Sequence, residues 1–177
     1  MIAPPADDRS GPPLGREARA IFVQDFASLD APFPAMAREA QHDQDGLLEH
    51  GLGAALSECE HLSEVVGPEL WPTSLGRSAD VVPGPTRQSP GGVLIAFRWE
   101  PVGTGGSFPQ LDADLELAPL GPELTVVSVR GRYRRPECPP GEPNQDALMH
   151  RIAERTVRAF LTGVCLELRD RAISAKG

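Results

Sequence analysis

The stretch DADLELAP, from Asp112 to Pro119, continued by LTVVSVRGRYR, from Leu124 to Arg134, decides the fold of this chain. Apolar and polar residues alternate in both segments, which is the pattern of strands that turn one face to a core. A long amphipathic segment, Asp146–Arg171, follows them and has the periodicity of an α-helix. Strands followed by a terminal helix indicate an α+β protein.

The charges of the two strands predict how they pair. If the turn around Leu120–Glu123 holds an odd number of residues, charged positions lie opposite charged positions and apolar positions meet on the inner face. An even turn would oppose charged and apolar faces, so we predict the odd one. The arginines then point outward as cross-strand partners of acidic residues and form no inward anion site. The predicted pairs are Asp114 with Arg130, Asp112 with Arg132, and Leu115 with Val129.

The rest of the chain gives weaker but consistent patterns. Val93, Ile95, Phe97 and Trp99 share the inward face of the clearest strand. Helical spacing of leucines predicts a helix after a shorter proline-initiated one. The elements expected before the final two strands and helix are a strand at Ala18–Phe26, helices at Pro34–Gln41 and Gly46–Glu60, and strands at Leu62–Val66, Gly76–Val82 and Gly92–Glu100.

Length and composition predict one domain. A chain of 177 residues with 40% hydrophobic and 24% charged residues resembles an ordinary globular protein. Residues 1–16 are rich in proline and have little to bury, so we expect a disordered leader, a domain over residues 17–171 and a flexible tail over residues 172–177.

Charge and cysteine content limit the partners and the compartment. With 25 acidic and 17 basic residues the net charge is −8, which disfavours nucleic acid and anionic lipid surfaces. No signal peptide or membrane-spanning run is predicted. Three cysteines without a close-spaced pair, Cys59, Cys138 and Cys165, indicate neither a disulfide framework nor a zinc site. We therefore predict a soluble cytoplasmic protein with no integral membrane association; its oligomeric state stays open.

The terminal helix has a wide apolar stripe suited to covering a sheet. At 100° per residue its apolar residues fall within roughly half a turn of one another, and most arginines lie opposite. His150 lies at the border of the stripe, as either a polar anchor for a ligand or an ordinary boundary residue. The stripe comprises Met149, Ile152, Ala153, Thr156, Val157, Phe160, Leu161, Val164 and Leu168.

The segment FRWEPVGTGGSFPQLDADLELAPLGPELTVVSVRGRYRRP and the helix ALMHRIAERTVRAFLTGV resemble the last three strands and the gripping helix of actinobacterial members of the START-like helix-grip superfamily, also called SRPBCC. The resemblance covers about Ala18–Leu168. It implies a curved antiparallel sheet of six to seven strands around a long C-terminal helix, two short helices after the first strand, and a cavity beneath the long helix. The superfamily shares a scaffold and no universal catalytic motif, so no catalytic residue is carried over.

The leading functional hypothesis is a module that binds or carries a small hydrophobic ligand, such as a lipid, between sheet and helix. An enzyme of the polyketide cyclase or dehydratase type, with Tyr133 or His150 assisting proton transfer, is one alternative. A cavity filled by its own side chains, in an accessory or interaction protein, is the other. The expected ligand-binding residues are Phe97, Trp99, Leu115, Val129, Tyr133, Met149, His150, Ile152 and Phe160.

Other groups of residues in the sequence do not indicate a metal, catalytic or phosphate-binding site. His42 and His50 are eight residues apart, whereas helical zinc sites place histidines four apart. Cys59 stands two residues before His61, but nucleophile and base normally meet through the fold. The glycine-rich loop Pro101–Pro109 lacks the lysine of a phosphate loop and is expected to be a mobile connection near the cavity mouth. No catalytic motif, metal site or cofactor site is predicted.

Overall fold

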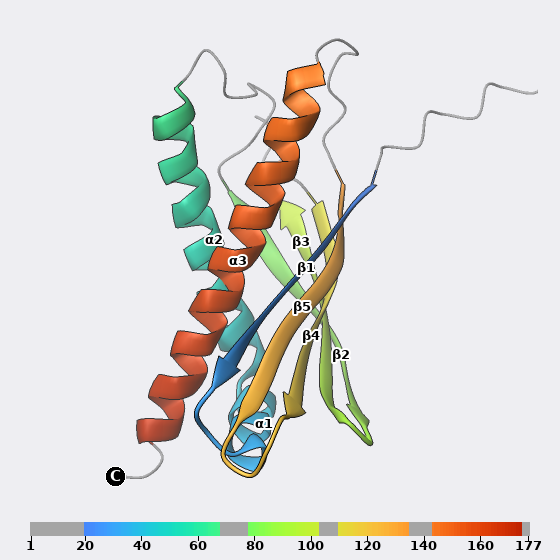
Figure 1. Ribbon diagram of the computed structural model, residues 1–177, viewed down its shortest axis with the longest axis vertical. Helices are drawn as coiled ribbons and strands as arrows, with labels where there is room; N and C mark the ends of the chain where they lie inside the picture. The colour runs from blue at the N-terminus through green and yellow to red at the C-terminus, as the bar shows by residue number, and fades with distance from the viewer. Residues whose placement is uncertain (1–19, 68–77, 103–109, 135–142, 175–177) are drawn as a thin grey trace, which may run out of the picture.

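The computed structural model describes residues 20–67, 78–102, 110–134 and 143–174 (Figure 1). Within these ranges a curved five-stranded sheet is covered on one face by two long helices, with a shorter helix at one end. This is the helix-grip arrangement, as predicted. The elements in chain order are β1 (Ala20–Leu29), α1 (Phe33–His42), α2 (Gln44–Val66), β2 (Ala79–Ser89), β3 (Gly92–Pro101), β4 (Gln110–Pro119), β5 (Thr125–Arg134) and α3 (Pro143–Ser174).

The sheet is antiparallel throughout, with the strand order β1-β5-β4-β3-β2. Pro119 pairs with Thr125, so the turn between β4 and β5 holds five residues. The predicted odd turn and the predicted register are therefore confirmed. Asp114 lies opposite Arg130, Asp112 opposite Arg132, and Leu115 opposite Val129.

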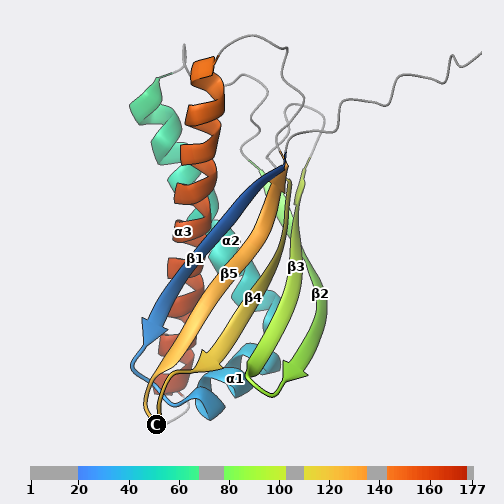
Figure 2. The ribbon, with the colours of Figure 1, turned by 45° about the vertical axis from the view of Figure 1, so that its right-hand side comes forward.

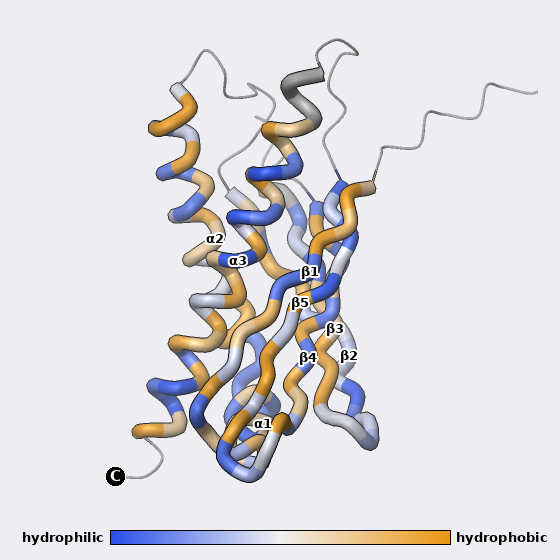
Figure 3. The backbone as a smooth tube through the Cα atoms, viewed as in Figure 1, coloured by the Kyte–Doolittle hydropathy of each residue, from blue (hydrophilic) through white to orange (hydrophobic). Residues whose placement is uncertain are grey.

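Alternate residues of each strand face the helices and are buried. Ile95, Leu115, Leu117, Val127 and Val129 have no exposed surface, whereas their polar neighbours in sequence face solvent. Figure 3 shows the same alternation of hydrophobic and hydrophilic residues along the strands. Burying one face of the sheet fixes the register, because a slip of one residue would expose the whole apolar set.

Helices α2 and α3 run side by side in opposite directions over the buried face (Figures 1 and 2). Helix α3 packs against β1, while α2 packs against β2, so the two helices together cover the buried face of the sheet. Their close approach uses glycine: a Cβ on Gly163 would lie 2.9 Å from Cβ of Ala54, and one on Gly51 would lie 2.7 Å from the Phe160 ring. The resemblance predicted one covering helix, and α2 is the second.

One cluster ties the end of α3 to the start of α2. The Asp43 carboxylate accepts a hydrogen bond from the Gly46 amide (3.0 Å) and so caps α2. Arg171 donates to the same carboxylate (3.0 Å), to the Asp43 carbonyl (2.9 Å) and to Glu167 (2.7 Å). At the other end of the interface Arg155 pairs with Glu58 (2.8 Å).

Several predicted boundaries are wrong. Residues 62–66 form the last turns of α2 and no strand, because Leu62 and Ser63 continue its buried face from Ala55 and Cys59. The second helix is therefore long, and the described sheet has five strands, fewer than the six to seven predicted. Helix α3 extends to Ser174, into the predicted tail.

Strand β2 also continues beyond its predicted end at Val82, through Pro83 and Pro85 to Ser89. It lies at the edge of the described sheet, where a proline leaves no ladder hydrogen bond unmade, and its register shifts between Pro83 and Thr86. The predicted leader, the loop over residues 103–109 and Cys138 lie outside the described residues.

Candidate functional site

Two neighbouring rows of inward positions cross the sheet near the end where β5 and β3 finish. The row nearer the end of the sheet holds large side chains. The next row has its smallest residues, Gly131 and Ala113, in the middle. A Cβ on Gly131 would lie 2.6 Å from Cβ of Ala113, so no side chain fits there. The rows are Ile21–Tyr133–Leu111–Trp99–Val81 and Val23–Gly131–Ala113–Phe97–Pro83.

Three aromatic rings pack together beside this row of small residues. Phe160 of α3 stacks on Phe97 of β3, with ring centroids 4.8 Å apart and planes inclined by 13°. Trp99 is tilted against Phe160, with centroids 5.5 Å apart. Stacked and tilted contacts of this kind are favourable beyond the apolar area they bury. The cluster therefore provides flat apolar faces inside the protein.

Tyr133 brings a polar group into this apolar interior. Its side chain is fully buried, and its hydroxyl has no hydrogen-bond partner of normal geometry among the described residues. Burial raises the pKa of Tyr133 well above its ordinary value, while the nearby Thr156 hydroxyl acts in the opposite direction. Thr156 donates instead to the backbone carbonyl of Ile152 (2.8 Å). The Tyr133 phenol is therefore neutral near pH 7, and its hydroxyl is not held by a hydrogen bond of normal geometry.

Most of the predicted ligand-binding residues lie in this layer. Each except His150 is at most 4% exposed. The His150 side chain is half exposed and lies 3.2 Å from Glu154, so it faces solvent and not the interior. The buried ones are Phe97, Trp99, Leu115, Val129, Tyr133, Met149, Ile152 and Phe160; their role in binding stays a prediction.

Helix α2 contributes to this interior in a way that the sequence pattern did not predict. Cys59 and Leu62 are buried on the face of α2 that completes the interior, and Cys59 lies near enough to Tyr133 to influence its pKa. The spacing of Ala55, Cys59 and Leu62 carries the helical signal, but the apolar run over residues 62–66 also fits a strand. Leu111, directly opposite Tyr133, was missed because the predicted strand began one residue later.

The other chemistry-bearing residues form no site. Cys59 is buried while His61 is exposed, so the two side chains do not meet. Burial raises the pKa of Cys165 to about 11, which keeps its thiol protonated and unreactive near neutral pH. Within the described ranges no group of histidine, cysteine and carboxylate side chains has the arrangement of a metal site. His50 lies 3.5 Å from Glu167 of α3.

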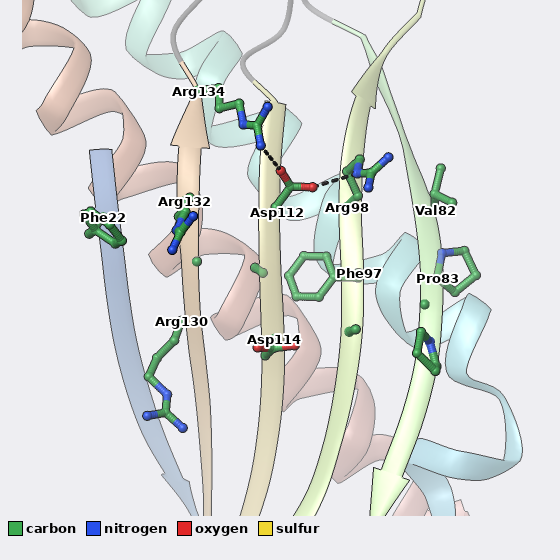
Figure 4. Close-up of a pocket in the computed structure, with 15 residues that line it drawn as sticks. Phe22, Val82, Pro83, Phe97, Arg98, Asp112, Asp114, Arg130, Arg132 and Arg134 are labelled. Atoms are coloured by element: carbon green, nitrogen blue, oxygen red, sulfur yellow. Dashed lines mark hydrogen bonds and ion pairs between the residues drawn. The ribbon is translucent and has the colours of Figure 1, made fainter. Parts of the chain in front are cut away.

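The opposite face of the sheet carries a hollow of about 680 Å³ (Figure 4). In this hollow Asp112 pairs with Arg98 (2.7 Å) and Arg134 (3.3 Å), while Arg130 pairs with Glu116. The Arg132 guanidinium lies over the Phe22 ring, 5.4 Å from its centroid. The hollow is lined by Phe22, Val82, Pro83, Gly84, Pro85, Ala96, Phe97, Arg98, Asp112, Ala113, Asp114, Arg130, Gly131, Arg132 and Arg134.

Comparison with known proteins gives structural similarity alone. No family model matches the chain, and no curated protein matches it in sequence. Similar solved structures include the Zhui aromatase/cyclase from Streptomyces sp. R1128, with a TM-score of 0.49, 17% identity, and coverage of 90% of this chain and 99% of that one. TTHA0849 from Thermus thermophilus has a TM-score of 0.44, 16% identity and coverage of 89% and 100%. Ara h 8.0201 has a TM-score of 0.31, 9% identity and coverage of 82% and 98%.

None of the described helices has an apolar stretch long enough to cross a bilayer.

Proposed function

We propose that this protein binds a small, flat, largely apolar molecule between the sheet and the α2–α3 pair. The observation that carries the proposal is the Tyr133 hydroxyl, which is buried beside an aromatic cluster without a hydrogen bond of normal geometry. A buried polar group of this kind costs free energy unless something pairs with it. A ligand with one oxygen acceptor would pair with the hydroxyl and lie against the rings.

The shape of the ligand follows from the rings. Phe97, Trp99 and Phe160 now contact one another, and a planar ligand would replace these ring–ring contacts with ring–ligand contacts of the same kind. The interior can thus close without a ligand and open for one, at the cost of a population shift between the two states. The resemblance to the helix-grip superfamily agrees with this location.

Binding is favoured over proton-transfer catalysis as the function. A catalytic acid or base works best when its pKa lies near the working pH. Burial moves the pKa of Tyr133 away from that range, and the other suggested group, His150, faces solvent. The two groups suggested for the cyclase alternative, Tyr133 and His150, are therefore poorly suited to acid–base chemistry, whereas a neutral phenol suits recognition of a carbonyl oxygen.

The test uses the matched pair fluorene and fluorenone, which differ by one carbonyl oxygen. We expect saturable binding of both, tighter for fluorenone, measured by calorimetry or by quenching of tryptophan fluorescence. Tyr133→Phe should weaken fluorenone binding about fivefold, the worth of one hydrogen bond, and leave fluorene unchanged. Phe97→Leu should weaken both ligands by about two- to tenfold through loss of the stacking face.

Val127→Ala is the control, because it also removes buried apolar atoms but lies towards the opposite end of β5. It should leave both affinities unchanged. Absence of saturable binding of either molecule, together with native mass spectra that show no bound compound, would contradict the proposal. Equal losses in Phe97→Leu and Val127→Ala would place the binding elsewhere.

A further inference from the structure

The face of the sheet that points away from the helices differs in charge from the rest of the molecule. Its positions, read from the register, hold five arginines and five acidic residues, so it is neutral although the chain carries a net charge of −8. The arginines are Arg87, Arg98, Arg130, Arg132 and Arg134; the acidic residues are Asp80, Glu100, Asp112, Asp114 and Glu116. Two copies that meet through this face are not repelled there by their overall charge.

The same face exposes large apolar side chains. Phe22 and Phe26 of β1 are each 71% exposed, and Val82 of β2 is 43% exposed. Phe22 projects at the edge of the hollow, as Figure 4 shows. Exposed aromatic residues are enriched in protein interfaces, where they fill recesses of the partner. A projecting ring beside a recess is a shape that a second copy of the same surface can match.

Four of the ten charged residues on this face have no ion pair among the described residues: Asp80 and Arg87 of the edge strand β2, and Asp114 and Arg132 of the inner strands β4 and β5. Among the described residues neither Arg132 nor Asp114 forms an ion pair, because Asp112 is engaged by Arg98 and Arg134, and Arg130 by Glu116. Arg132 and Asp114 lie on adjacent strands, and Figure 4 shows both beside the hollow. A two-fold axis that passes between Arg132 and Asp114 places Arg132 of each copy against Asp114 of the other, as an isologous interface requires.

From these three features we infer that the outer face of the sheet is the interface of a symmetric homodimer. Phe22 and Phe26 anchor it, and Arg132 of each copy pairs with Asp114 of the other. The inference is independent of ligand binding, since it concerns the opposite face of the sheet.

The first experiment measures oligomeric state by sedimentation velocity over a wide concentration range. We expect the wild type to be a dimer, and the double variant Phe22→Ser/Phe26→Ser to be a monomer with an unchanged circular dichroism spectrum. Ile173→Ser is the control, because Ile173 is also largely exposed (64%) but lies on α3. It should remain dimeric. A monomeric wild type, or a dimer that survives loss of both phenylalanines, would overturn the inference.

The second experiment tests the charge pairing by mixing. Arg132→Asp alone opposes two carboxylates across the axis, and Asp114→Arg alone opposes two guanidinium groups, so each should weaken self-association about tenfold or more. Mixed together, the two variants restore opposite charges and should form a heterodimer. Recovery of association in the mixture must come from pairing between copies, because neither chain carries both substitutions. If the mixture associates no better than either variant alone, the Arg132–Asp114 pairing is wrong.

Discussion

The two faces of one sheet have opposite characters, although alternate residues of the same strands build both. Along β5, Val127, Val129 and Tyr133 face the helices and are fully buried, while Arg130 and Arg132 face solvent. The inner face owes its stability to ring packing and apolar burial, and the buried Tyr133 hydroxyl, which has no hydrogen bond of normal geometry, suggests a ligand. The outer face is held by exposed ion pairs and suggests a partner. A single strand thus encodes two surfaces with independent requirements.

The largest expected difference in stability is between the loss of an aromatic ring from the inner side of the sheet and the loss of one from its outer face. Phe160→Ala removes the centre of the aromatic cluster and should lower the free energy of unfolding by about 3–5 kcal/mol. Phe22→Ala loses only a contact with Arg132 and should cost about 1 kcal/mol or less. Urea denaturation at low protein concentration, where association contributes little, measures both. Similar losses in the two variants would contradict the assignment of the faces.

A smaller effect is expected where the strands themselves approach closely. Gly131→Ala places a Cβ 2.6 Å from Cβ of Ala113 and 2.7 Å from the Asp112 carbonyl oxygen, so β4 and β5 must separate. We expect a loss of about 1–3 kcal/mol in unfolding free energy. Gly121→Ala is the control, since a Cβ there meets nothing within 4 Å. The prediction fails if the two substitutions have the same effect.

The buried phenol should make stability depend on alkaline pH. Tyr133 is the only tyrosine, so ultraviolet absorbance reports its ionisation alone. Its pKa is higher in the folded than in the unfolded chain, so above pH about 10 the unfolded state loses a proton that the folded state keeps. Stability from this group should therefore be constant below that pH and fall above it, by up to about 1.4 kcal/mol per pH unit. Tyrosinate absorbance that appears near pH 10 in the folded protein would refute this.

The weakest effect is expected from the ion pairs of the outer face. Asp112→Asn removes the partner of Arg98 and Arg134, which are both more than half exposed. Exposed pairs are screened by water and salt, so the change in melting temperature should be smaller than that of any inner-face variant above. Raising the salt concentration should shrink it further. If Asp112→Asn lowered stability as much as Gly131→Ala does, the ion pairs of the outer face would contribute more to stability than exposed ion pairs normally do.

The sequence predicted those features that a local pattern determines. The pairing of β4 with β5 followed from charges at alternate positions, and the buried side of α3 followed from its stripe. The length of α2 did not, because the short apolar run Leu62–Val66 also fits a strand. Within the predicted helix, Gly51 and Gly53 weaken the helical pattern. The structure shows that Gly51 is a packing residue, since a Cβ there would strike Phe160 and Val164. A glycine required by a neighbour on a distant helix cannot be distinguished from a breaker in one sequence.

The sites were predictable to a similar extent. Alternation along the strands predicted five of the buried positions and the helical stripe of α3 predicted three, but neither pattern can show that the Tyr133 hydroxyl has no hydrogen bond of normal geometry. His150 lies at the border of the helical stripe, where the sequence pattern left both alternatives open, and its half-exposed side chain fits the boundary residue. The outer hollow depends on how strands bend and on where Pro83 and Pro85 shift β2, which periodicity does not contain.

The strand order has a consequence for synthesis on the ribosome. Strand β1 has one neighbour in the described sheet, and that neighbour is β5, the described strand furthest from β1 along the chain. Residues 20–29 therefore wait without a sheet partner until most of the chain has emerged, with Phe22 and Phe26 uncovered. Pairing over such a separation is slow, and unpaired apolar strands aggregate readily. The nascent chain should therefore depend on chaperones that hold its first strand.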